Sequence, residues 1–294
     1  MEERDLNLSI KVLILGSTGL IGHQVYNYLT NNTNYEISDI AFRKKLNKNS
    51  ILIDATNETN LIKCIEKKSP NYIINCIGIL ISDADITPEN TIFLNALMPH
   101  KLKNIADRIN ARLIHMSTDC VFSGFKGKSY IENDLKDGLD TYSKTKGLGE
   151  IISDNHLTLR TSVVGPELKE NGSQLFHWFM GQTGTISGYT DVFWSGVTTL
   201  ELAKAVNWSI DNNITGLYHV TNNTRISKND LLKLFKKYTN KDIEILPSSG
   251  KNIDKSFLDT RYLIDYQIPS YEKMISDMVE LILTDKELYS QYKI

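Results

Sequence analysis

The first half of the chain alternates short, almost uninterrupted apolar runs with longer segments in which apolar residues recur at helical spacing. Such runs are typical of parallel strands that helices cover on both faces, because a strand of this kind has no solvent-facing side. We predict these strands at residues 10–15, 36–42, 51–53, 72–77 and 112–117. We predict the intervening helices up to about residue 29 and at about 59–68 and 95–110. The order predicts an α/β fold with a doubly wound parallel sheet of the Rossmann type.

The pattern changes after about residue 165, where glycines divide the chain into shorter pieces. Helices are predicted at about 199–210, 228–238 and 271–284, with Ser227 as the N-cap of the second, and a further strand at 216–220. We therefore expect a nucleotide-binding Rossmann domain over residues 10–165. Residues 166–294 are expected to form mainly a smaller C-terminal substrate-binding subdomain, with about 196–222 returning to the first domain.

Composition narrows the possible partners. Of the 294 residues, 41% are hydrophobic, which is enough for a sizeable core, and the formal net charge is only -2. That balance argues against a nucleic-acid or anionic-membrane partner, since both require a clustered positive field. Residues 1–9 are polar and the longest apolar run, at 72–81, is too short to span a bilayer, so we expect a cytoplasmic protein. The three cysteines lack metal-ligand spacing and are expected to be reduced thiols, so no metal site is predicted.

A glycine-rich stretch lies between the first predicted strand and the first helix. One glycine can make a tight turn, one can let backbone N–H groups approach a pyrophosphate, and one can allow close helix–sheet packing. The helix N-terminus adds a partial positive charge. The stretch therefore predicts a dinucleotide-binding loop made of Gly16, Ser17, Thr18, Gly19, Leu20, Ile21 and Gly22.

The residue after the second strand indicates which nicotinamide cofactor is used. Arg43 is placed to contact a 2′-phosphate, so we expect NADPH, with NADH as the alternative. Asp54 could accept a hydrogen bond from the adenine amino group, and Gly78 is small enough for the dinucleotide to lie close. Asn95 could be an N-cap or could orient a lysine through water. The expected cofactor contacts after the glycine-rich loop are Arg43, Asp54, Ala55, Cys76, Ile77, Gly78 and Asn95.

Tyr142 and Lys146 are spaced i and i+4, so a helix would place them on one face. Hydride transfer to a carbonyl needs a proton donor for the forming alkoxide, and a tyrosine pKa of about 10 suits neutral pH poorly. We expect the Lys146 ammonium to lower the pKa of Tyr142 and also to hold the nicotinamide ribose. Thr118 follows the strand at 112–117, where it could polarise a substrate carbonyl or could simply cap a loop.

These motifs occur in the order of the extended short-chain dehydrogenases. Ser-Thr-Asp-x-Val-Phe-x-Gly at 117–124 and Thr-Lys-x-x-Gly-Glu at 145–150 more narrowly resemble the dTDP-4-dehydrorhamnose reductases and related sugar-nucleotide reductases. The resemblance implies a catalytic triad of Thr118, Tyr142 and Lys146 that reduces the 4-keto group of a nucleotide-linked 4-keto-6-deoxysugar in surface polysaccharide biosynthesis. It further implies a homodimer and substrate contacts from Thr118, Asp119, Cys120, Val121, Arg160 and Trp194.

Two departures from that family leave the identity of the substrate open, including a UDP-linked or N-acetylated sugar. Cys120 stands where these reductases commonly have tyrosine, and residues 252–256 replace their Arg-Pro-x-x-Ser stretch. One alternative is a bifunctional 3,5-epimerase/4-reductase in which Cys120 is the acid–base thiol and His177 its partner. Another is a non-catalytic nucleotide-binding subunit, similar to the regulatory subunits of methionine adenosyltransferase, although an intact triad argues against pure binding.

Overall fold

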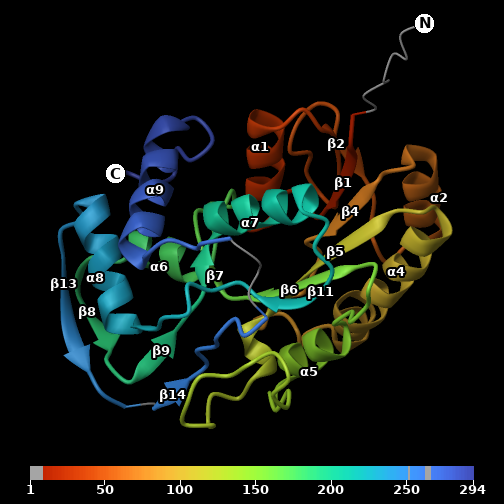
Figure 1. The fold of residues 1–294 in the computed structure, drawn as a ribbon. Helices are drawn as coiled ribbons and strands as arrows, with labels where there is room; N and C mark the ends of the chain where they lie inside the picture. Colours follow the sequence, from red (N-terminus) through yellow and green to blue (C-terminus); the bar gives the residue numbers. More distant parts are fainter. Residues whose placement is uncertain (1–8, 251, 262–265) are drawn as a thin grey trace, which may run out of the picture.

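The computed structural model describes residues 9–250, 252–261 and 266–294, and its main feature is a parallel sheet of seven described strands (Figure 1). The strands are β1 Lys11–Leu15, β2 Glu36–Ala41, β3 Ile51–Leu52, β4 Tyr72–Asn75, β5 Arg112–Thr118, β6 Leu157–Thr161 and β11 Gly216–His219. They lie in the order β11-β6-β5-β4-β1-β2-β3, and every neighbouring pair is parallel. The chain reverses its direction of winding between β1 and β4. In sheets of this kind, ligands bind outside the carboxyl ends of the strands at that reversal.

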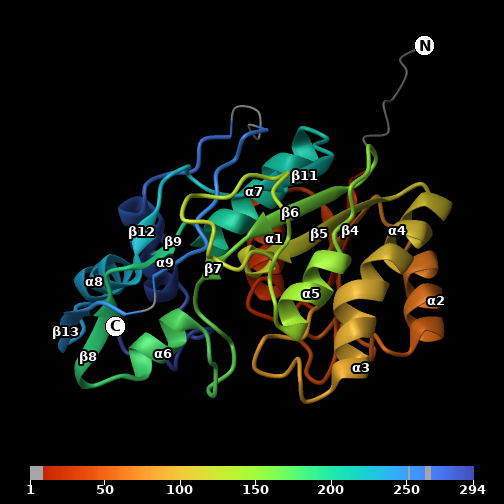
Figure 2. The same cartoon turned by 90° about the horizontal axis from the view of Figure 1, so that it is seen from below.

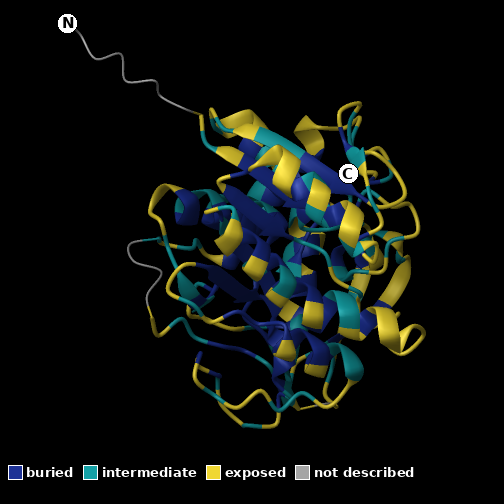
Figure 3. Cartoon of the chain, turned by 90° about the vertical axis from the view of Figure 1, so that its right-hand side faces the viewer, coloured by how far each residue is buried: buried dark blue, intermediate teal, exposed yellow. Residues whose placement is uncertain are grey.

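Helices cover both faces of this sheet, which confirms the predicted doubly wound α/β class. They are α1 Gly22–Asn32, α2 Glu58–Lys68, α3 Pro88–Thr91, a π-helical turn Ile92–Leu97, α4 Met98–Arg108, α5 Thr141–Leu148 and α7 Thr199–Asp211. Val12 and Ile14 of β1 pack in a cluster with residues of α1 and α7, whereas Leu13 and Leu15 pack in another with residues of α2 and α4. Because both sides of β1 are buried from Val12 to Leu15, its sequence there is continuously apolar. Figure 3 shows this burial in the strands, with exposed residues on the outer turns of the helices.

A second lobe follows β6 (Figure 2). It contains β7 Val163–Val164, α6 Leu175–Gly181, β8 Gly184–Tyr189, β9 Val192–Trp194, β10 Val197–Thr198, β12 Ile226–Ser227, α8 Lys228–Thr239, β13 Ile243–Ser248, β14 Ile253–Asp254 and α9 Tyr271–Thr284. β8 pairs with β13, and β9 lies between β12 and β14. Between these elements the chain returns to the sheet, where α7 packs on α1 and β11 pairs with β6. The division of the chain near residue 165 stays a prediction.

The helix predicted at 95–110 begins earlier than expected. Helical structure runs from Pro88 to Arg108 through the π-helical turn, so Asn95 lies inside it and the N-cap interpretation of Asn95 is wrong. Pro99 has no N–H with which to bond the carbonyl of Asn95, and a widened turn accommodates such a missing bond. By contrast, Ser227 is the predicted N-cap, because its Oγ accepts a hydrogen bond of 3.0 Å from the N–H of Asp230.

Candidate active site

The glycine-rich loop lies at the carboxyl end of β1, against the end of β4. Gly16 has φ +81°, a left-handed conformation that favours glycine, and a Cβ there would lie 3.2 Å from the Cys76 carbonyl carbon. A Cβ on Gly22 would lie 2.2 Å from the carbonyl oxygen of Gly16. Side chains are thus excluded from both positions, and the loop backbone turns tightly into α1. This is a cradle in which a dinucleotide pyrophosphate fits.

The start of α1 leaves its positive end available. Among the described residues, neither a side-chain cap at Ile21 nor an acidic residue in the first turn neutralises it. His23 holds the loop from inside: its Nδ1 lies 2.8 Å from the Gly19 carbonyl oxygen and its Nε2 3.1 Å from the Tyr289 hydroxyl. Burial lowers the pKa of His23 to about 4, so a neutral imidazole makes these bonds. The Ser17 hydroxyl donates to Asp39 at 2.5 Å and its N–H donates to the Ile40 carbonyl at 3.2 Å, so Ser17 anchors the loop to β2.

The carboxyl end of β2 is basic. Asp39, the carboxylate nearer to this end of β2, is buried and accepts hydrogen bonds from Ser17 and Asn47. Arg43 is exposed just beyond the strand, with its guanidinium carbon 4.9 Å from the centre of the Phe42 ring. This exposed guanidinium fits a phosphate on the adenosine ribose better than it fits a free diol. Asp54 is exposed after β3 and Ala55 beside it is buried, and the Asp54 Oδ1 accepts hydrogen bonds from Thr56.

Helix α5 carries Tyr142 and Lys146. It begins at the N-cap Asp140, whose carboxylate accepts hydrogen bonds from the Ser143 N–H at 2.7 Å and its hydroxyl at 2.8 Å. Lys146 is buried and its Nζ donates to the Met116 carbonyl at 2.6 Å, which ties the helix to β5. Burial lowers the pKa of Lys146 to about 8, although the charge of Glu150 opposes the effect. The ammonium therefore stays mostly charged at neutral pH.

Tyr142 has the opposite pKa shift to the one expected. Burial raises its pKa above the ordinary value, and the negative charges that Cys120, Asp119 and Asp140 can carry reinforce the shift, while interaction with Thr118 opposes it. The prediction that Lys146 lowers this pKa is therefore wrong for this structure, because burial dominates and the ammonium is directed to the Met116 carbonyl. The phenol is protonated at neutral pH, which is the form required of a proton donor.

Thr118 ends β5 and caps the short 3-10 turn Asp119–Val121. Its hydroxyl accepts from the Cys120 N–H at 3.1 Å and donates to the Asp119 carboxylate at 3.1 Å. Thr118 therefore caps the turn, as one of the two interpretations expected, and its hydroxyl also interacts with the Tyr142 phenol. Val121 is buried in a small apolar cluster. Thr118 and Tyr142 therefore form a pair of hydroxyl groups at the strand end.

Asn95 and Gly78 complete the wall beside Lys146. The Asn95 amide exchanges two hydrogen bonds with the backbone of Ile79, at 2.8 and 2.9 Å. A Cβ on Gly78 would lie 3.4 Å from the Asn95 Oδ1 and 4.0 Å from the Lys146 Nζ. Gly78 thus leaves open the space between β4 and Lys146, while Asn95 fixes the backbone after Gly78. The neighbouring side chains of Cys76 and Ile77 are partly buried.

Cys120 is a poor acid–base group in this position. Burial, together with the negative charge of Asp119, raises the pKa of its thiol to about 12. His177, the partner considered for it, has Nδ1 2.8 Å from the Tyr292 hydroxyl and Nε2 3.1 Å from the Glu170 carbonyl oxygen. Both imidazole nitrogens are thus engaged elsewhere, and the epimerase–reductase alternative is not favoured.

Two predicted substrate contacts lie in the interior. Arg160 is 2% exposed, and its guanidinium makes two hydrogen bonds of 2.7 Å to Glu150 and one of 2.8 Å to His219. Trp194 is 3% exposed and its ring packs at 5.7 Å from that of Tyr271. The expectation that either side chain is free to bind substrate is contradicted in this structure. The sequence motifs place both residues near strand ends, but they do not show which way the side chains point.

The sequence reasoning also missed residues around the site. Glu150 is buried, accepts a 2.6 Å hydrogen bond from Ser117 and holds Arg160; its position as the last residue of Thr-Lys-x-x-Gly-Glu was a usable signal. Lys228, the first residue of α8, has its Nζ 5.6 Å from the centre of the Trp194 ring. Burial lowers the pKa of Lys228, and the charge of Asp119 opposes this shift. Nothing in the sequence beyond its place after an N-cap distinguished Lys228.

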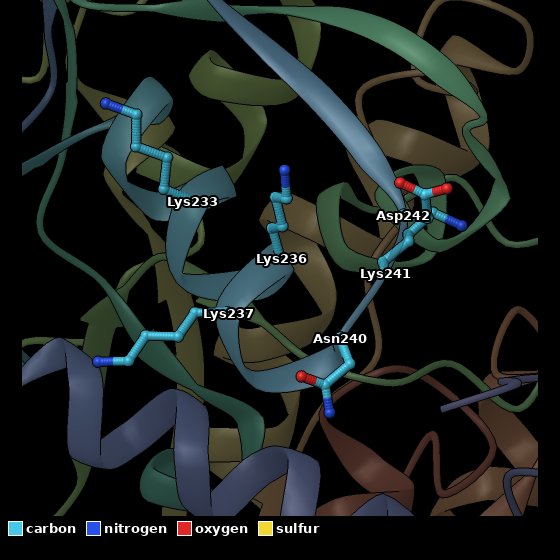
Figure 4. Close-up of a pocket in the computed structure, with 6 residues that line it drawn as sticks. All are labelled: Lys233, Lys236, Lys237, Asn240, Lys241 and Asp242. Atoms are coloured by element: carbon cyan, nitrogen blue, oxygen red, sulfur yellow. The ribbon is translucent and has the colours of Figure 1, made fainter.

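Another feature of the second lobe is an open hollow between α8 and β13 (Figure 4). Figure 4 shows lysine side chains around it, and none of its lining residues is a predicted site residue; they are Lys233, Lys236, Lys237, Asn240, Lys241 and Asp242.

In the described residues, no group of three or more His, Cys, Asp or Glu side chains is arranged to hold a metal ion. No helix in the described ranges is long and apolar enough to cross a bilayer.

The reversal of the sheet at β1 and β4, with Tyr142 and Lys146 on the helix after β5, defines the class of extended short-chain dehydrogenases/reductases. Within this class the chain belongs to the RmlD substrate binding domain family, whose sequence model matches residues 10–256. This confirms the family inferred from the motifs.

Individual relatives agree with this membership. The chain is 30% identical over 157 residues to a dTDP-4-dehydrorhamnose reductase of Aggregatibacter actinomycetemcomitans, a match that spans about half of each chain (52% and 51%). It is 27% identical over 222 residues to the dTDP-4-dehydrorhamnose reductase of Salmonella typhimurium, covering 72% of each chain. A crystal structure of dTDP-4-dehydrorhamnose reductase from Bacillus anthracis in complex with NADP superposes with TM-score 0.79 at 23% identity, over 93% of this chain and all of the other. That likeness shows a shared fold.

Proposed function

We propose that this protein is an NADPH-dependent reductase of the 4-keto group of a dTDP-linked 4-keto-6-deoxysugar. The observation that carries the proposal is the grouping of Thr118, Tyr142 and Lys146 at the carboxyl end of β5, beside the open backbone at Gly78. The relatives named above are reductases of this kind, and a related spore coat polysaccharide biosynthesis protein of Bacillus subtilis points to surface polysaccharide synthesis. We further propose a cytoplasmic location and a homodimer.

The residues of the cofactor cradle fit a phosphorylated dinucleotide. Gly16–Gly22 would hold the pyrophosphate against the N-terminus of α1, and Arg43 would hold the 2′-phosphate. Lys146 would hold the nicotinamide ribose across the gap left by Gly78. When bound, the cofactor supplies the hydride that reduces the carbonyl carbon.

The chain's own residues supply the proton and the polarisation. On substrate binding, the Thr118 hydroxyl turns from the Asp119 carboxylate to donate a hydrogen bond to the substrate carbonyl oxygen, and so stabilises the negative charge that develops there. Tyr142 transfers its phenolic proton to that oxygen, and its raised pKa keeps the proton available at neutral pH. An alkoxide is much more basic than a phenolate, so this proton transfer is favourable even with the raised pKa.

The test is a panel assay. Purified protein is mixed with NADPH or NADH and with dTDP-, UDP- and GDP-linked 4-keto-6-deoxysugars, and the loss of reduced cofactor is followed by absorbance. We expect oxidation of NADPH with the dTDP sugar, and a fall of about 100-fold or more in Tyr142→Phe, because positioned proton donors contribute factors of this size. Tyr238→Phe, at the far end of α8, controls for the loss of a phenol as such.

Silence across the panel by a protein that binds NADPH would overturn the proposal. So would full activity in Tyr142→Phe. Oxidation of NADPH only with the UDP- or GDP-linked sugar would support the reductase activity but overturn the assignment of dTDP as the nucleotide.

A further inference from the structure

Lys228 sits at an unusual place for a lysine. It is the first residue of α8 and follows β12, which pairs antiparallel with β9 so that Ile226 faces Trp194. Its half-buried side chain lies over the Trp194 indole, with Nζ 5.6 Å from the ring centre. Within the part of the chain that the structure describes, its ammonium has no carboxylate within 4 Å and no hydrogen-bond acceptor.

The fold does not explain this charge. An ammonium that is partly removed from water without a paired carboxylate or acceptor costs free energy. The first turn of a helix is also the end with partial positive charge, where acidic rather than basic side chains are stabilising. The cation–π contact with the Trp194 indole offsets part of this cost. A charged lysine at position 228 therefore lowers the free energy of unfolding. Residues that do so are typically kept for binding or catalysis.

The surroundings of Lys228 connect it to the catalytic strand end. β14 extends the same small sheet as β12 and β9, and it docks on the loop that follows β5, where the Asp254 N–H donates to the Gly124 carbonyl at 3.0 Å (Figure 1). This docking brings the small sheet, which ends one residue before Lys228 in β12, against the segment that begins at Thr118. Burial lowers the pKa of Lys228, and Asp119 and Cys120 at the end of β5 are the groups that oppose the effect.

We propose that Lys228 binds the diphosphate of the nucleotide-sugar substrate and is thereby a substrate-binding residue of this chain. The inference rests on the proposed function. The 4-keto-6-deoxysugar ring carries no charge, so the diphosphate is the one anionic part of such a substrate that an unpaired ammonium would select. Lys228 reaches the site from the second lobe, while the catalytic groups come from the first. Substrate binding therefore joins the two lobes at this point.

The experiment compares Lys228→Met with Lys233→Met, a matched change on the exposed side of the same helix, where Lys233 pairs with Asp230. Binding of dTDP, of thymidine and of NADPH is measured by calorimetry, and KM and kcat with the dTDP-linked 4-keto-6-deoxysugar. In Lys228→Met we expect the Kd of dTDP and the KM of the sugar nucleotide to rise about 10-fold or more. Thymidine and NADPH binding are expected to stay unchanged, kcat to stay within about three-fold, and Lys233→Met to behave as the parent. Lys228→Arg should restore most of the dTDP affinity.

Thermal unfolding distinguishes binding from a structural role. We expect Lys228→Met to unfold at the same or a higher temperature than the parent, because it removes a desolvated, unpaired charge. The inference is overturned if dTDP affinity is unchanged in Lys228→Met. It is also overturned if thymidine affinity falls equally, or if the variant is less stable and loses NADPH affinity as well. Since dTDP binding needs no turnover, a Lys228-dependent dTDP affinity in a protein that reduces no sugar would refute the proposed reductase and leave this inference standing.

Discussion

At the scale of single residues, the surroundings at the carboxyl end of β5 keep the Tyr142 phenol and the Cys120 thiol protonated. Burial raises the pKa of both Tyr142 and Cys120, and the nearby carboxylate of Asp119 adds to each shift. A site that must donate a proton to an alkoxide benefits from a phenol that is protonated at neutral pH. A site that must remove a carbon-bound proton needs a base, and a thiol with a pKa of about 12 is a poor source of one. The same environment therefore favours reduction over epimerisation.

Replacement of the thiol separates these two chemistries. We expect Cys120→Ser to keep NADPH oxidation within about three-fold of the parent, because serine has nearly the size of cysteine and its hydroxyl stays protonated, as the thiol does. In D2O, neither protein should incorporate solvent deuterium at C3 or C5 of the sugar, as read by mass spectrometry of the product. Deuterium incorporation that is present in the parent and lost in Cys120→Ser would instead establish an epimerase step.

At the scale of elements, β1, the glycine-rich loop and α1 act as one unit. The sequence predicted this unit because its requirements are local: an apolar strand, glycines at fixed positions and an uncapped helix start. Asn95 shows the opposite case, because its position inside a widened helical turn depends on Pro99 and on contact with the Gly149 backbone of α5. Such a contact between distant segments leaves no periodic signal in the sequence.

Gly22→Ala tests the loop as an element. A Cβ at this position would lie 2.2 Å from the Gly16 carbonyl oxygen, which is backbone and cannot turn aside, so the loop must shift. We expect NADPH affinity to fall about 10-fold or more and the protein to lose about 1 to 3 kcal/mol of unfolding free energy, as overpacked sites do. Calorimetry and urea unfolding measure the two effects. Gly181→Ala is the matched control, because a Cβ on Gly181 at the end of α6 meets no atom within 4 Å among the described residues. If Gly22→Ala and Gly181→Ala had the same NADPH affinity and the same unfolding free energy, the close approach of Gly22 to the Gly16 carbonyl oxygen would be contradicted.

At the scale of the whole molecule, a buried polar network joins the two lobes. Glu150 binds Arg160, Arg160 binds His219, and the His219 Nδ1 lies 2.8 Å from the Leu258 carbonyl oxygen in the second half of the chain. Glu132 continues the network through a 2.6 Å hydrogen bond from Thr260. The sequence predicted the class of fold, but not this network. Arg160 was expected to meet substrate, because the sequence does not show that its enclosing partners come from segments up to 59 residues away along the chain.

The network makes stability sensitive to acid. Burial lowers the pKa values of His219 and His23 from 6.5 to about 4, so between these two pH values the unfolded chain binds more protons than the folded one. Unfolding free energy must therefore fall as pH drops from about 6.5 to about 4, by up to about 1.4 kcal/mol per pH unit for each histidine. The lowered pKa of Glu150 extends the loss to lower pH, as its carboxylate becomes protonated.

Urea unfolding at several pH values between 4 and 7 measures this slope. His219→Gln should reduce the slope by up to the contribution of one proton, whereas His100→Gln, at an exposed position, should leave it unchanged. A slope that is the same in His219→Gln and the parent would show that His219 is not held neutral in the fold.

The central claim is that this molecule moves a hydride from NADPH to C4 of a nucleotide-linked sugar. The direct measurement uses NADPH carrying deuterium at C4 of the nicotinamide, in each of its two stereochemical forms, with the dTDP-linked 4-keto-6-deoxysugar. Mass spectrometry and NMR of the product locate the label. The account predicts one deuterium at the sugar C4 from one of the two forms, and none with Tyr142→Phe over the same period. Oxidised cofactor without deuterium in the sugar, or a changed sugar without cofactor oxidation, would contradict it.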